Sequence, residues 1–559
     1  MLHRPVLLLG VFLAPALRAA PQSLPASHLP REALLAVEAP DLSATLEDVL
    51  GGEAWKRFRE GELGQFVFQQ PQVQVGLASL GMFGNAAGAE PQEVLQALTG
   101  GGAAFALLPA ESGPQAVLLF RALDPDLAQD GINAILNFVT GGATRVSGDS
   151  WRIPLPKAKV VMGRHKDLFV LSNAAEALDR LEPAEGESLA DVRGFQQARE
   201  ATPDADLRLW IGDALLHGDN RFVDPMANFG GVIFAGGVKE VLHRAPWACL
   251  QVNVGPRNLR AELLAPADAQ ALDKDYEPFF PDPGEVEVPR LPSGLATLVV
   301  HRRMGPIWTS RDLYLTERGL ADTVEADGTL SLLYQRDYGP EILHWLEPEF
   351  LLVGARTSFP MGRPEVEFPA GALRVRMRKG HPEDLGQSFV NAFLGTITFT
   401  NFDGNKGSRG TLQIDMEALE DGSKLYTSSW KKPEADQPIP PRYNLSPAML
   451  LGKDGAIWLS SSTPLLKEIA RSPQEKKVAP GDRFELDFGP ARKILEADRE
   501  ALVAQQTLEQ GGDVDSAQAH VDRILAATRL FDRMEARSHL QNGFYRLSLE
   551  IRNDEVPQH

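Results

Sequence analysis

The feature that most constrains the fold of this chain is a segment that occurs twice. Residues 126–136 and 384–394 agree at six of eleven positions, and each copy follows a proline and an apolar, strand-like run. In the second copy Leu385, Phe389 and Phe393 recur every four residues, the spacing of one buried helical face. The sequence therefore predicts that a strand followed by this helix is built twice in one chain.

Further matches keep the same order along the chain. They pair residues 93–98 with 341–346, 103–108 with 350–353, 168–172 with 456–460, and 255–263 with 543–551. The offset between matched positions grows by about thirty residues after the repeated helix, which places an insertion in the second copy. We expect this insertion to form an extended hairpin near residues 396–430, with 396–401 as a strand. A period this long indicates two related modules in tandem and not a solenoid.

The strand-like runs favour an α+β fold. In residues 151–155 and 545–549 apolar and polar side chains alternate, which is typical of antiparallel strands with one buried face. We therefore expect each module to be a mainly antiparallel sheet with helices packed on one face. Two helical stretches, 490–510 and 514–537, are separated by a pair of glycines and predict a helical hairpin late in the second module.

Proline content sets the expected domain boundaries. Residues 278–292 contain five prolines, which forbid a helix and disfavour a central strand, so we interpret this segment as a linker. The first module is then expected to cover residues 21–277. The second is expected to cover residues 293–559.

The N-terminal residues have the pattern of a cleaved secretory signal. A short basic start precedes an apolar run, residues 6–14, that is too short to span a bilayer. We expect residues 1–20 to be removed and the mature chain to be soluble, in the periplasm or outside the cell. The single cysteine, Cys249, lies in an alternating strand pattern and is expected to be a buried small side chain, with no internal disulfide.

The charge of the chain argues against two classes of partner. Its formal net charge is −19, and such a surface repels nucleic acid and anionic lipid headgroups. After the signal, no segment approaches the roughly 18 consecutive apolar residues of a membrane helix. We expect neither a nucleic-acid partner nor a transmembrane segment after signal removal, which leaves an unknown envelope protein or polymer as the expected partner.

The sequence carries no motif for catalysis, metal binding or cofactor binding. It lacks a phosphate-binding loop, H-E-x-x-H, G-x-S-x-G and a calcium loop, and its histidines are not spaced as helical metal ligands. Residues 147–151 superficially resemble the nucleophile block of some secreted esterases, but no downstream Asp-x-x-His block supports them. We therefore expect no catalytic residues, no metal and no cofactor.

One short basic cluster is a surface candidate for an anionic ligand. An apolar run is followed by His301, Arg302 and Arg303, which could form a positively charged site at the end of a strand. A strand end that is simply solvated would have the same composition, so both interpretations stay open.

Two polar pairs form a second surface candidate. Gln129 with Asn133, and Gln387 with Asn391, stand four residues apart in the two copies of the repeated helix. A common binding surface would explain why both copies hold them. A shared ancestor, with each helix packed near a sheet edge, would explain them equally well.

The chain resembles a family of large exported bacterial proteins described only as a domain of unknown function. The resemblance rests on the signal pattern, on a strand followed by Ala-Pro-Asp-Leu at 39–42, on a Leu-Ser step at 171–172 and 459–460, and on the duplication. It covers most of the chain after residue 20 and brings no catalytic residues with it.

The duplication itself carries no duplicated acid, base or ligand set. We therefore expect a non-catalytic exported envelope protein with a binding or scaffold role for an unknown ligand. The alternative is a secreted hydrolase whose site lies in the cleft between the modules, a common position for ligand sites.

Overall fold

The computed structural model describes residues 25–554, apart from 112, 140–143, 148–149, 156–157, 166, 182, 219–224, 268–271, 283, 361, 406–410, 432–438, 479–480 and 510–511. The predicted signal, residues 1–20, lies outside the described part. The chain divides into two compact units: unit 1 holds residues 1–221, 242–266 and 548–559, and unit 2 holds 222–241 and 267–547. Among the described helices, none is long and apolar enough to cross a membrane.

Unit 1 combines a run of helices with ten strands. The strands are β1 (Leu35–Ala39), β2 (Ala103–Leu108), β3 (Gln115–Arg121), β4 (Thr144–Ser147), β5 (Ser150–Leu155), β6 (Ala158–His165), β7 (Leu168–Ser172), β8 (Leu207–Gly212), β9 (Trp247–Val254) and β10 (Asn258–Pro266). The helices are α1 (Leu42–Gly51), α2 (Glu53–Glu60), α3 (Glu62–Phe68), α4 (Pro71–Ala87), α5 (Pro91–Thr99), α6 (Pro125–Val139), α7 (Arg193–Ala201) and α8 (Asp213–His217). Asp41 fixes the start of α1 because its carboxylate accepts a hydrogen bond from the N–H of Ala44 at 2.8 Å.

Unit 2 has a similar composition of elements. Its strands are β11 (Glu285–Pro289), β12 (Gly294–His301), β13 (Glu349–Ala355), β14 (Ala370–Arg376), β15 (Leu412–Ala418), β16 (Lys424–Trp430), β17 (Ala448–Leu451), β18 (Ala456–Ser460), β19 (Gln474–Val478), β20 (Asp482–Asp487) and β21 (Arg533–Gln541). Its helices are α10 (Met304–Thr309), α11 (Glu317–Tyr334), α12 (Leu385–Asn405), α13 (Thr463–Arg471), α14 (Phe488–Ala497), α15 (Arg499–Glu509) and α16 (Val514–Thr528). Two further elements, α9 (Phe229–Arg244) and β22 (Phe544–Arg552), cross the division between the units.

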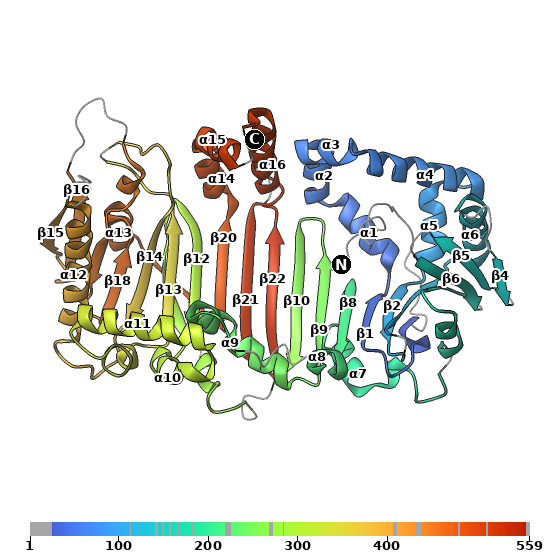
Figure 1. Cartoon of the computed structure of the whole chain (residues 1–559), viewed down its shortest axis with the longest axis horizontal. Helices are drawn as coiled ribbons and strands as arrows, with labels where there is room; N and C mark the ends of the chain where they lie inside the picture. Colours follow the sequence, from blue (N-terminus) through green and yellow to red (C-terminus); the bar gives the residue numbers. More distant parts are fainter. Residues whose placement is uncertain are drawn as a thin grey trace. The chain divides into compact units, whose positions relative to one another are not determined.

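From β9 in unit 1 and from β21 in unit 2, the strands pair in the same order, and every pairing described here is antiparallel. In unit 1 the neighbours run β10, β9, β8, β1, β2, β3, β7, β6, β5, β4. In unit 2 they run β21, β20, β12, β13, β14, β18, β17, β16, β15. Figure 1 shows β14, β13, β12, β20 and β21 side by side in unit 2. The expectation of an α+β fold with mainly antiparallel sheet is confirmed.

One serine has the same surroundings in each sheet. Ser172 ends β7, and its hydroxyl donates to the carbonyl oxygen of Ala116 at 2.9 Å. Ser460 ends β18, and its hydroxyl lies 3.1 Å from the carbonyl oxygen of Gly371. Both hydroxyls also accept a hydrogen bond at 3.1 Å from the N–H two residues further along the chain.

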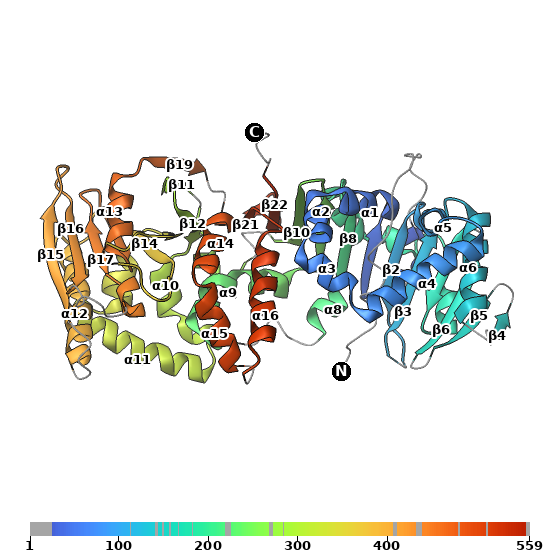
Figure 2. The ribbon, with the colours of Figure 1, turned by 90° about the horizontal axis from the view of Figure 1, so that it is seen from above.

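The sheet of unit 2 is covered on both faces, which corrects the expectation of helices on one face. Leu465, Leu466 and Ile469 of α13 pack with β11 and Trp458 in one buried cluster. The buried stripe of α12 packs in a second cluster, with Ile457. Figure 2 shows α13 and α12 on opposite sides of the strands. The reason lies in β18, whose residues 456–459 are all apolar and therefore require cover on both faces.

The expected linker at 278–292 is folded into unit 2. Phe279 is buried in a cluster with Val232, Ile307 and Tyr314. The following residues form β11, which pairs antiparallel with β19 as a separate two-stranded sheet. The prolines do not interrupt this strand, because Pro289 stands at its last position.

The hairpin expected near 396–430 begins later than predicted. Residues 396–401 belong to α12 and not to a strand, whereas β15 and β16 form the hairpin at 412–430. The threonines of this stretch are accommodated because Thr396 and Thr400 donate their hydroxyl protons to the carbonyl oxygens four residues earlier, at 2.8 and 2.9 Å. Ile397 also continues the buried stripe of Phe389 and Phe393.

The end of α12 is tied to the first residue of β15. The side-chain amide of Asn401 donates to the carbonyl oxygen of Leu412 at 3.0 Å, and its oxygen accepts from the N–H of Leu412 at 2.7 Å. One edge of β15 pairs with β16. Asn401 bonds the backbone of Leu412 at the opposite edge, where a further strand would otherwise pair.

Two smaller predictions can be compared with the structure. In the predicted helical hairpin, α15 and α16 are joined by Arg499 and Asp522, whose side chains make two hydrogen bonds of 2.8 Å. Residues 533–537 were expected to be helical but form the start of β21. Cys249 is buried in β9, as predicted.

Candidate binding site

The candidate site lies in unit 2, at two connections that are longer than their counterparts in unit 1. Residues 356–369 join β13 to β14 and residues 431–447 join β16 to β17, whereas the corresponding connections of unit 1 are 109–114 and 156–157. Described residues of both long connections, together with one face of α13, line a pocket of about 750 Å³. That volume is in the range of about 300–1,000 Å³ that is usual for small-molecule sites. We call it the α13 pocket.

Aromatic side chains form part of the α13 pocket. The rings of Trp430 and Tyr443 lie 5.9 Å apart between centroids at an angle of 36°, and Phe359 also lines the pocket. The guanidinium group of Arg442 lies 5.7 Å from both ring centroids. The indole N–H of Trp430 donates to the backbone, 2.6 Å from the carbonyl oxygen of Leu445. What Trp430 can offer a ligand is therefore its ring surface.

Much of the remaining lining carries hydroxyl groups. These residues are Thr357, Ser358, Ser428, Ser429, Ser446, Ser462, Thr463 and Ser472. Thr463, the first residue of α13, connects three segments: its hydroxyl lies 2.9 Å from the carbonyl oxygen of Ser428 and 3.0 Å from that of Ser446. Its N–H donates to the hydroxyl of Ser446 at 3.0 Å. The start of α13 is thereby bonded to β16 and to the long connection after it.

The long connection 356–369 is held by buried polar groups. Arg356 donates to the carboxylate of Glu367 at 2.6 and 3.1 Å. Asp498 accepts two hydrogen bonds from the N–H of Glu367, and the side chain of Asn444 bonds both Phe368 and Val366. Glu367, Asp498 and Asn444 are all buried. A site whose supporting groups are fixed in this way loses little conformational entropy when a ligand binds.

Charge in the pocket is mostly positive. The described lining holds Arg290, Lys467 and Arg471 against the single carboxylate of Glu468. Of the cations, Arg290 has an exposed ion pair with Glu475 at 3.6 Å. A local excess of positive charge stands out in a chain whose formal net charge is −19.

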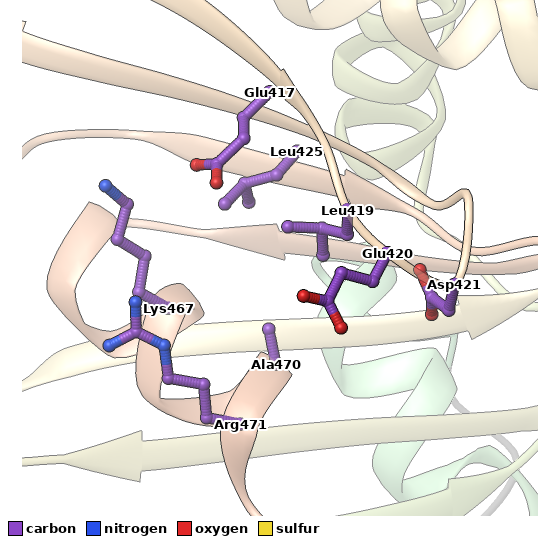
Figure 3. Close-up of a pocket in the computed structure, with 8 residues that line it drawn as sticks. All are labelled: Glu417, Leu419, Glu420, Asp421, Leu425, Lys467, Ala470 and Arg471. Carbon is purple, nitrogen blue, oxygen red and sulfur yellow. The ribbon is translucent and has the colours of Figure 1, made fainter.

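Lys467 and Arg471 also line a second, smaller pocket of about 320 Å³. Its opposite wall is the end of β15 and the turn that follows, which contribute Glu417, Glu420 and Asp421. Figure 3 shows the carboxylates of Glu417 and Glu420 and the cationic ends of Lys467 and Arg471 facing the same space. These two cations therefore stand between an acidic wall and the hydroxyl-rich α13 pocket.

The described lining of the α13 pocket is poor in acidic and imidazole groups. Its described lining contains neither histidine nor cysteine, and Glu468 is its one carboxylate. General acid–base catalysis needs a positioned group that exchanges protons near neutral pH, most often histidine or a paired carboxylate. Among the described residues of the chain, no group of three or more His, Cys, Asp and Glu side chains could hold a metal ion.

The basic cluster predicted at the end of a strand lies at the end of β12. His301 and Arg302 are buried. Arg302 pairs with Asp482, at 2.6 and 3.0 Å, and also donates to the carbonyl oxygens of Ile233, Phe279 and His301. Arg303 is paired with Glu277 at 2.9 Å. The arginine donors at this position are directed at protein acceptors.

The two predicted polar pairs make the same hydrogen bond in the two units. The amide of Gln129 donates to the side-chain oxygen of Asn133 at 3.1 Å, and Gln387 donates to Asn391 at 3.0 Å. Gln129 also accepts from Arg164 of β6 at 3.2 Å. None of these residues lines the α13 pocket, and the question of a common binding surface stays open.

Sequence reasoning missed the α13 pocket because its parts lie far apart in the chain. The hydroxyls of Thr357 and Ser462, which are 3.4 Å apart, are separated by 105 positions. The prolines near residue 440 indicate a loop but not its role. The available signal was the length of these two connections, since binding residues often lie on long loops held by a rigid framework.

The chain was compared with family models, with curated proteins and with solved structures, and none of these comparisons gave a significant match.

Proposed function

We propose that this chain is a non-catalytic, exported envelope protein built from two related modules, and that the α13 pocket of the second module binds its ligand. The proposal rests first on the lining of that pocket, which offers ring surfaces, hydroxyl groups and cations but a single described carboxylate. Export rests on the N-terminal sequence pattern.

The relation between the modules is supported by matched hydrogen bonds as well as by the order of strands. After the two matched serines, the side chain of Asn173 accepts from the N–H of Ala116 at 3.0 Å, and the side chain of Ser461 accepts from the N–H of Gly371 at 2.9 Å. Unrelated sheets would not be expected to repeat both the pairing order and these side-chain bonds. On this proposal, the first module keeps the framework and the second has acquired the site.

A binding assay with a blocked pocket tests the proposal. Purified chain is titrated by calorimetry with oligosaccharides and peptides of the bacterial envelope, and each mixture is then analysed chromatographically for products. We expect at least one ligand to bind without being cleaved. Ser429 is an exposed residue of the lining, so Ser429→Trp should fill the pocket and abolish binding without disturbing the core.

The matched control is Thr329→Trp, which adds the same side chain to an exposed position of α11 outside the lining. Binding should be unchanged in this variant. Ligand that still binds to Ser429→Trp would contradict the assignment of the pocket. Cleavage of a bound ligand would contradict the non-catalytic role and favour the alternative of a secreted hydrolase.

A further inference from the structure

The α13 pocket combines ring surfaces with many hydroxyl groups. The ring planes of Trp430 and Tyr443 make an angle of 36°. The indole N–H of Trp430 is already bonded to the backbone. Ring surfaces favour flat or C–H-rich ligand faces. The hydroxyls of Ser428, Thr463 and Ser472 already donate to backbone carbonyl oxygens. Those of the exposed Ser358 and Ser429 can donate to and accept from a ligand that is itself rich in hydroxyl groups. A sugar ring has both properties, with C–H groups on its faces and hydroxyls at its edge.

The cations of the pocket indicate that the sugar carries a negative charge. Lys467 and Arg471 are four residues apart on α13 and line the same two pockets. Like charges at this spacing repel each other on a helix. Among the described residues neither side chain has an ion-pair partner. An anion in the α13 pocket would relieve this repulsion, and a carboxylate is matched by the fork of the arginine.

We infer that the α13 pocket binds a carboxylated oligosaccharide, with sugar rings against Trp430 and Tyr443 and a carboxylate near Lys467 and Arg471. This inference rests on the proposed function, because it names the ligand of the same pocket. Nucleic acid would also combine stackable rings with negative charge, but the hydroxyl-bearing lining of the pocket matches the many hydroxyl groups of an oligosaccharide better.

The acidic residues of the second pocket add a further prediction to this inference. Glu417 and Glu420 face the same space as Lys467 and Arg471 in the second pocket (Figure 3). A ligand carboxylate therefore competes with the turn for the two cations. Removing a cation should weaken binding of the charged sugar, and removing an acid from the turn should strengthen it.

The test uses hexamers of galacturonate, mannuronate and hyaluronan as probes, with cellohexaose as the neutral sugar and hexaglutamate as the acidic peptide. Each is titrated into the full chain by calorimetry, at low and at high salt. We expect at least one uronate-containing hexamer to bind at least about tenfold more tightly than cellohexaose. We expect that binding to weaken as salt rises, since exposed charges are screened.

Variants then show whether binding depends on the charge of the ligand or only on its shape. Lys467→Gln should weaken binding of the charged hexamer about tenfold and leave cellohexaose unaffected. Glu420→Gln should strengthen binding of the charged hexamer by about two- to fivefold, the effect expected of an exposed charge. The control, Lys493→Gln, makes the same charge change at an exposed position of α14 outside the lining and should have no effect. Circular dichroism and melting curves verify that each variant is folded.

The outcomes distinguish this inference from the proposed function. Equal binding of cellohexaose, preference for hexaglutamate, or binding unchanged in both Lys467→Gln and Arg471→Gln would overturn the inference. The proposed function would survive those results as long as Ser429→Trp abolishes the binding that is seen. If none of the charged hexamers binds, the inference is overturned, and if no ligand of any class binds, the proposed function fails with it.

Discussion

Arg356 and Glu367 are joined by two hydrogen bonds across the two ends of the connection from β13 to β14. The carboxylate of Glu367 is buried and the guanidinium group of Arg356 is about one-third exposed. Glu367→Gln removes the charge from the buried end, so we expect the free energy of unfolding to fall by about 1–3 kcal/mol. Urea denaturation measures this loss. Glu365→Gln, an exposed neighbour, should stay within about 0.5 kcal/mol of the parent chain.

The matched serines allow the similarity of the units to be tested by stability. Ser172→Ala and Ser460→Ala each remove a buried hydroxyl that lies within hydrogen-bond distance of a carbonyl oxygen of the neighbouring strand and accepts from an N–H of the connection that follows. We expect each change to lower the free energy of unfolding by about 1–3 kcal/mol. Hydrogen exchange of the two units, followed separately by mass spectrometry, should locate each loss in its own unit. A loss for one serine and none for the other would contradict equal roles.

His301 should make unit 2 sensitive to acid. Burial lowers the pKa of His301 below its ordinary value near 6.5, although Asp482 and Glu349 oppose this shift and Arg302 adds to it. The unfolded chain therefore takes up a proton before the folded chain does. The contribution of His301 to stability is constant above about pH 6.5 and falls as the pH drops from there to the lowered pKa, by up to about 1.4 kcal/mol per pH unit.

Urea denaturation at a series of pH values measures this dependence. His301→Gln should flatten it, whereas His520→Gln, on α16, should not. If the parent chain and His301→Gln lose stability in parallel below pH 6.5, the assignment to His301 is wrong.

Cys249 should be chemically inert while the chain is folded. Burial raises the pKa of its thiol to about 12, and Glu38 adds to this effect while Arg208 opposes it. The thiolate is the reactive form, so iodoacetamide should label the native chain very slowly at neutral pH. Labelling in urea should be complete within minutes. Rapid labelling without denaturant would show that β9 opens easily.

The repeated helix was predictable from sequence because its signal is local. Leu385, Phe389 and Phe393 recur at helical spacing, and all three are buried on α12. The extent of that helix was not predictable in the same way, because threonines at 396–401 favour strands unless their hydroxyls find helical acceptors. Cover on both faces of the sheet was visible in uninterrupted apolar runs such as that of β18.

The candidate site could not be predicted from the sequence, for a different reason. Thr463 is bonded to Ser428 and Ser446, which precede it by 35 and 17 positions, and no periodic pattern relates these three residues. The burial of Phe279 was hidden for a related reason: its partners, such as Val232 and Ile307, are brought to it only in the folded chain. Contacts of this kind depend on the tertiary fold and leave no mark in local composition.

The bond between Asn401 and Leu412 has a consequence for how the protein behaves at high concentration. An exposed edge strand invites pairing with other chains, and β15 carries apolar side chains, Ile414 and Met416, that would aid such aggregation. Asn401 already occupies the N–H and the carbonyl group of Leu412, so an incoming strand cannot begin its ladder there. A single amide side chain thus blocks edge-to-edge pairing at the first position of β15.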